Sequence, residues 1–211
     1  PSQVATVTQT PTVTLTATPG PAVKLAFIVQ PSNTLAGAPI LPMVQVAIQD
    51  AVGRTVPYAT NTITIALGTN PNGGTLGGTL TVGPVNGVAT FPNLSIDKSE
   101  QGYTLVASST GLSSATSAAF NILPGPAASF VITGVVTPTV TAGTAMNITV
   151  TAKDQFGNQA STYNGTVSFS ASGDTQAVLP PNYTFVPADF GVHTFTGIVL
   201  KTAGARTLTV A

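Results

Sequence analysis

Hydrophobic and polar residues alternate with a period of two in many short stretches of this chain. Val44, Val46 and Ile48 face one side of such a stretch, and the residues between them are less apolar. The pattern returns about a hundred residues later, where Ile148 and Val150 alternate with Thr. Alternation of this kind is typical of strands with one buried face. No stretch has a convincing helical period, so the sequence predicts an all-β protein.

The predicted strands are short and are separated by Gly, Pro and Asn. In the first half we expect strands at residues 23–30, 42–50, 61–67, 78–82, 87–96, 102–109 and 115–122. In the second half we expect them at residues 128–136, 147–154, 163–170, 176–179, 191–200 and 205–211. Short strands at this spacing are typical of an immunoglobulin-like β-sandwich.

The chain contains an internal repeat. The tetrapeptide PGPA occurs at residues 19–22 and again at 124–127, a shift of 105 residues. GVATF at residues 87–91 corresponds to GVHTF at 191–195, a shift of 104 residues. Anchors in the same order at nearly constant spacing indicate homologous units. We therefore predict two tandem immunoglobulin-like domains, the first at residues 22–124 and the second at residues 125–211.

The sequence predicts one strand before the first domain and one strand too few in the second domain. The first domain has a seventh strand at residues 115–122, whereas the second reaches Ala211 after its sixth. Residues 7–18 alternate between apolar positions and Thr, and PGPA follows them as it follows the seventh strand. We therefore predict that residues 1–21 are a donor strand, although a linker rich in Thr and Pro has a similar composition. Its apolar face is formed by Val7, Val13, Leu15 and Ala17.

A sandwich without its last strand exposes a sheet edge and an apolar groove. We expect the acceptor groove of the second domain to be lined by Phe130, Ile132, Leu208 and Val210. The N-terminal strand of a second copy fits such a groove by strand addition, which links copies head to tail. The offset of the strands therefore predicts that the partner of the protein is a second copy of itself, in an extracellular, pilus-like filament.

The offset of the strands is also compatible with two different arrangements. The chain can be a piece of a longer tandem array, such as a stalk or adhesin that binds a carbohydrate or protein of a host surface or matrix through its loops. The Gly- and Asn-rich residues 68–79, predicted to form a flexible exposed loop, are one candidate for such binding. Alternatively, the N-terminal strand can fold back onto the second domain of its own copy.

The sequence also resembles a known group of repeats. Residues 143–158, 163–167, 191–195 and 207–210 resemble the bacterial immunoglobulin-like tandem repeats of large surface and adhesin proteins, and are loosely similar to filamin repeats. The resemblance covers both units and is closer in the second. It implies a sandwich fold and a stalk-like or adhesive role outside the cell, and it brings no catalytic residues.

The composition narrows the classes of partner. Charged residues make up 6% of the chain, against roughly 25% in an average soluble protein, and the net charge is zero. The few Lys and Arg residues are scattered, so no basic patch is expected for nucleic acid. No apolar run approaches the ~18 residues of a membrane span. Low charge, abundant Thr and the absence of Cys fit an extracellular or cell-surface protein.

Side chains suited to catalysis or metal binding are sparse. Asp50 and Asp154 precede a Gly at equivalent positions, and we expect their carboxylates to cap turns. His193 is the single His and has no nucleophile motif nearby. We therefore predict no enzyme activity, no cofactor and no metal site. Four asparagines have the sequence of N-glycosylation acceptors: Asn93, Asn147, Asn164 and Asn182.

Overall fold

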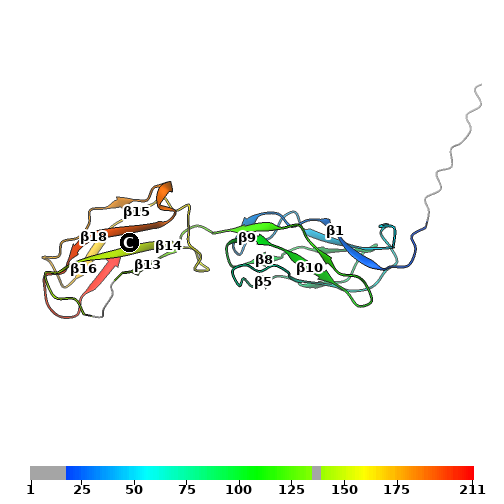
Figure 1. Cartoon of the computed structure of the whole chain (residues 1–211), viewed down its shortest axis with the longest axis horizontal. Helices are drawn as coiled ribbons and strands as arrows, with labels where there is room; N and C mark the ends of the chain where they lie inside the picture. The colour runs from blue at the N-terminus through cyan, green and yellow to red at the C-terminus, as the bar shows by residue number, and fades with distance from the viewer. Residues whose placement is uncertain (1–17, 135–138) are drawn as a thin grey trace, which may run out of the picture.

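A computed structural model of the protein describes residues 18–134 and 139–211. These residues form β-strands and loops, with one short 3-10 helix, η1 (Pro187–Asp189). The strands form two groups that share no sheet, β1 to β12 and β13 to β19. Figure 1 shows the two groups lying end to end. The predicted all-β, immunoglobulin-like fold is confirmed; below, unit one means residues 22–124 and unit two residues 125–211.

The strands of unit one form the two faces of a sandwich. One sheet has the order β1 (Lys24–Val29), β3 (Val44–Gln49), β7 (Val88–Phe91). The other has the order β11 (Ala115–Thr116), β10 (Leu105–Ser108), β4 (Ile63–Leu67), β6 (Thr81–Val82). A third sheet joins β2 (Thr34–Leu35), β12 (Phe120–Leu123) and β9 (Glu100–Tyr103), and β5 (Leu76–Gly77) pairs with β8 (Ser95–Ile96).

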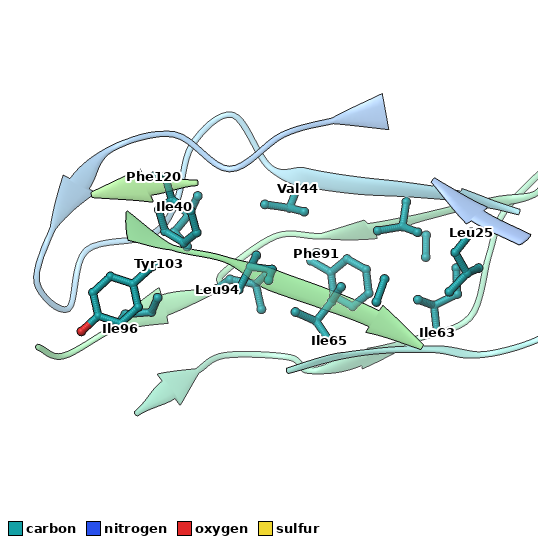
Figure 2. Packing of buried hydrophobic residues seen from close by; sticks show 14 of the residues in the cluster. Leu25, Ile40, Val44, Ile63, Ile65, Phe91, Leu94, Ile96, Tyr103 and Phe120 are labelled. Carbon is teal, nitrogen blue, oxygen red and sulfur yellow. The ribbon is translucent and has the colours of Figure 1, made fainter. Parts of the chain in front are cut away.

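The core of unit one lies between these sheets. Val44, Val46 and Ile48 of β3 are completely buried, as their alternation predicted. Ile63 and Ile65 face them from β4, and each is at most 1% exposed. Figure 2 shows the side chains of Val44, Ile63 and Ile65 pointing into the space between the layers. Burial of such side chains stabilises the fold by about 1.5–3 kcal/mol each.

Unit two repeats this plan with fewer paired strands. One sheet has the order β13 (Ser129–Thr133), β14 (Ala145–Lys153), β18 (Val192–Val199). Two strand pairs form the opposite side: β15 (Thr166–Val167) with β17 (Tyr183–Thr184), and β16 (Phe169–Ser172) with β19 (Thr207–Val210). The core contains Ile148, Val150, Val167, Phe185, Phe195 and Ile198.

One predicted strand of unit two is wrong. Residues 176–179 contribute only an isolated bridge from Val178 to Val199, and the strand expected there lies later in the chain, at β17. The side chain of Asp174 gives the physical reason. Its carboxylate accepts hydrogen bonds from the backbone N–H groups of Gln176 and Lys201, which hold the segment as a turn.

Candidate functional site

In unit one the seventh strand closes the sandwich between the first and sixth strands. β11 pairs with β10, and β12 pairs antiparallel with β9 and parallel with β2. Just before β11, the N–H of Leu25 on β1 donates to the carbonyl of Ser113 at 2.9 Å. Backbone groups of both neighbouring strands are therefore hydrogen-bonded to this segment.

The corresponding edge of unit two is open in the part of the chain that the structure describes. β13 and β19 are each at the edge of a sheet, and no described strand takes the place that β11 and β12 have in unit one. The four predicted groove residues lie on these two strands and pack against the core: Phe130, Ile132, Leu208 and Val210. The predicted donor residues lie outside the described residues: Val7, Val13, Leu15 and Ala17.

Burial differs between matched positions of the two units. Leu105 and Ala107 on β10 are completely buried, whereas Leu208 and Val210, at the same places on β19, are only partly buried. On the first strand, Leu25 is 4% exposed, and its counterpart Phe130 is only partly buried. The apolar surface that the seventh strand covers in unit one is therefore accessible in unit two.

The two aspartate turns share three hydrogen bonds from backbone N–H groups. Oδ1 of Asp154 accepts from the N–H groups of Phe156 and Asn158, both at 2.9 Å. Its Oδ2 accepts from the N–H of Gly125 and from the Asn158 amide, also at 2.9 Å. The prediction that Asp154 caps a turn is confirmed. The carboxylate also ties the linker between the units, through Gly125, to this turn.

The turn at Asp50 has the same arrangement. Oδ1 accepts from the N–H groups of Val52 and Arg54, and Oδ2 accepts from the N–H of Gly20 at 3.0 Å. The Arg54 guanidinium donates to Oδ2 at 2.9 Å and forms an ion pair with it. Burial raises the pKa of Asp50, but the hydrogen bonds from Gly20 and Arg54 outweigh it and lower the pKa to about 2.

The Asp154 turn also contacts unit one. The ring of Phe156 lies directly against Gly37, where a Cβ atom would overlap it. Nζ of Lys98 donates to the carbonyl of Phe156 at 2.7 Å. Asn158 accepts from the N–H of Ser99 and donates its amide to the Asp97 carbonyl at 2.8 Å. We call this contact the joint. Local sequence patterns did not reveal it.

His193 belongs to an aromatic cluster. Its ring stacks on Tyr183 with the ring centres 3.9 Å apart, and its Nδ1 lies 3.0 Å from Oδ1 of Asp189. The Val186 N–H and then His193 hold the pKa of Asp189 below its usual value. Burial and the neighbouring Asp189 raise the pKa of Tyr183. His193 is the second residue of β18. Its ring is held in place by aromatic packing and by the Asp189 carboxylate.

The remaining predicted features have a plain structural description. All four glycosylation acceptors are exposed: Asn93, Asn147, Asn164 and Asn182. In the predicted flexible loop, the side chain of Asn70 brackets Gly74 with hydrogen bonds of 2.7 and 2.9 Å, and Leu76 begins β5. This loop is therefore partly structured. Within residues 18–134 and 139–211, no group of three or more His, Cys, Asp or Glu could hold a metal ion.

A cleft lies beside the joint. Lys98, Ser99 and Glu100 line it from unit one, and Lys153 and Asn158 line it from unit two. The lining is polar and includes positively charged lysines and the negatively charged Glu100. Among the described residues, the structure contains no helix that is long and apolar enough to cross a membrane.

Comparison with solved structures finds low sequence identities. A β-glycosidase from Bacteroides vulgatus is 12% identical with a TM-score of 0.38, over 93% of this chain and 23% of that chain. Invasin, a bacterial integrin-binding protein, is 19% identical with a TM-score of 0.34, over 89% and 35%. Domains 5-6 of the S-layer protein SbsC are 18% identical with a TM-score of 0.36, over 90% of each chain.

The chain thus spans about a quarter of the glycosidase and about a third of invasin. No family model matches the sequence, and no curated protein matches it.

Proposed function

We propose that this chain is a structural, non-enzymatic subunit of an extracellular filament. In this proposal, the donor strand of one copy (residues 1–21) inserts into the open groove of unit two of another copy. Such contacts are head to tail, and they extend into a filament when the rotation between copies does not close a ring. The internal repeat supports the pairing, because Val13, Leu15 and Ala17 correspond to positions of the seventh strand of unit one.

The observation that carries the proposal is the difference in burial between the units. Leu105 is completely buried beside the seventh strand of unit one, whereas Leu208 is only partly buried. Covering apolar surface contributes about 25 cal/mol per Å², and an added strand also pairs the edges of β13 and β19. A strand inserted in this way dissociates slowly, because its removal requires the core to open.

The proposal is tested by electron microscopy and size distribution of the intact chain and of a variant that lacks residues 1–20. Filaments from the intact chain and monomers from the truncated variant are expected. A matched pair of full-length variants separates insertion from tethering. Leu15→Asp changes the apolar face and should abolish polymerisation, while Thr16→Asp changes the other face and should preserve it. Equal polymerisation of this pair contradicts strand insertion.

The competing function is a stalk or adhesin segment of a longer surface protein that binds a carbohydrate or protein. The polar cleft beside the joint favours it, because Lys98, Glu100 and Lys153 offer hydrogen-bonding groups of both charges. A purified chain that stays monomeric with and without residues 1–20 would favour this function. Binding to a carbohydrate array, lost in a Glu100→Ala/Lys153→Ala variant, would then be the next measurement.

A further inference from the structure

The joint has a projecting part on one unit and a receiving part on the other. Unit two projects Phe156 from the Asp154 turn, and unit one receives it on Gly37. Figure 1 shows the place where the two groups of strands meet. The receiving glycine is in the left-handed region with φ +75°, and its N–H donates to the carbonyl of Ile96. A side chain at this position would both strain the backbone and occupy the space of the Phe156 ring.

The projecting part is present a second time, on unit one. The Asp50 turn has the three backbone hydrogen bonds of the Asp154 turn, including the bond from Gly20 that matches the bond from Gly125, and Arg54 stands in the place of Asn158. Val52 stands in the position of Phe156 and is 73% exposed. It is thus an apolar side chain held out by a rigid turn, and no described residue covers it as Gly37 covers Phe156.

The receiving part is also present a second time, on unit two. Gly143 has φ +88°, and its N–H donates to the carbonyl of Leu200, as that of Gly37 does to Ile96. The next residue repeats the match, because the N–H of Thr144 donates to Thr141 as that of Ala38 does to Leu35. A Cβ atom built on Gly143 meets nothing within 4 Å.

A lysine also follows the receiving segment in both units, at positions that differ by one residue. In unit one, Lys98 follows Ile96 by two positions and binds the carbonyl of Phe156. In unit two, Lys201 follows Leu200 directly and is exposed. The Asp50 turn of unit one and the Gly143 segment of unit two therefore present complementary parts of a contact that the protein already makes once, between its own two units.

We propose that the joint is reproduced between copies, with the Asp50 turn of one copy docked on unit two of another so that Val52 covers Gly143. The proposed occupant is a second copy of this chain, and the inference rests on the proposed function, since strand insertion brings these two ends together. PGPA at residues 19–22 would then follow the inserted strand as residues 124–127 follow β12. Every joint along the filament would then point in the same direction, with the aspartate turn of one unit docked on the glycine of its neighbour.

Chemical cross-linking tests the inference, because the natural chain has no Cys. A Val52→Cys/Thr144→Cys variant is polymerised and treated with a short bismaleimide. Thr144 is used because any side chain at Gly143 is strained, and both substituted residues are exposed. A ladder of covalent multimers is expected to form at least about tenfold faster than in the control Ile28→Cys/Thr144→Cys, because docking holds the reacting groups at a high effective concentration. Ile28 is exposed and is the last residue but one of β1.

The outcomes separate this inference from the proposed function. Filaments that form without cross-links above the control overturn the joint between copies and leave strand insertion standing. Cross-links that form equally well without residues 1–20 support the joint and overturn strand insertion. A chain that remains monomeric and is not cross-linked overturns both, as expected if the exposed ends dock on other repeats of a longer protein. Circular dichroism of each variant establishes that it is folded.

Discussion

Replacing Asp154 by Ala should lower the unfolding free energy of unit two by about 4 kcal/mol. The residue is 2% exposed, and its carboxylate accepts four hydrogen bonds of 2.9 Å, three of them from backbone N–H groups. A buried donor left without a partner costs about 1–3 kcal/mol. We take about 1 kcal/mol for each donor, because water can reach a turn at the end of a sandwich, and obtain the total from four donors.

The assay is urea unfolding followed by tyrosine fluorescence. Tyr163 and Tyr183 report on unit two, and Tyr58 and Tyr103 report on unit one. The transitions are fitted separately, because two units need not unfold together. Asp97→Ala is the control, since the Asp97 carboxylate accepts one hydrogen bond, from the N–H of Thr75. We expect a loss of about 1 kcal/mol for this control.

A loss of stability in Asp154→Ala no larger than that in Asp97→Ala would refute this reasoning. That result would mean that the turn keeps its conformation without the carboxylate. A second readout follows the joint itself. Asn158 donates to Asp154 and to the Asp97 carbonyl, so losing Asp154 should also free Asn158. Small-angle scattering of Asp154→Ala should then indicate a wider range of angles between the units.

The remaining predictions concern acid stability and the groove. Asp50 and Asp154 have pKa values below those of unfolded Asp, ~3.9, so their stabilisation is present above about pH 4 and is lost as pH falls through the folded values, about 2 for Asp50. The melting temperature should therefore be level from pH 7 to 5 and fall between pH 4 and 2, and a level profile to pH 2 would contradict this. Leu105→Ala should cost about 2–5 kcal/mol, and Leu208→Ala distinctly less in the monomer, since Leu208 is only partly buried. Urea unfolding measures both, and equal losses would argue against an open groove in unit two.

Local patterns predicted most strands because alternation depends only on near neighbours. The β3 and β14 strands lie where Val44 to Ile48 and Ile148 to Val150 alternate. The aspartate turns were predictable for the same reason, since a carboxylate that caps its own turn bonds residues two and four positions later. The strand predicted at residues 176–179 was wrong because the conformation of this segment depends on the distant Lys201 and Thr202, whose N–H groups donate to Asp174.

Comparison of the repeats extended the predictions beyond local structure. Unit one served as a template, and its seventh strand predicted an acceptor groove on the strands that are β13 and β19 of unit two. The four residues named for the groove lie there, but the sequence could not say how exposed they are. Burial depends on which strands cover a side chain, and the partly buried state of Leu208 against the complete burial of Leu105 became visible only in three dimensions.

The sequence by itself determined the all-β class, the two aspartate turns and the positions of most strands, because these depend on neighbouring residues or on the repeat. Tertiary structure alone decided the joint. Phe156 is one apolar residue in a turn and Gly37 one glycine among many, and their contact exists because two separate units meet at one orientation. The same physical reason applies to the exposure of Val52 and to the open space beside Gly143, since both depend on what packs around these residues in three dimensions.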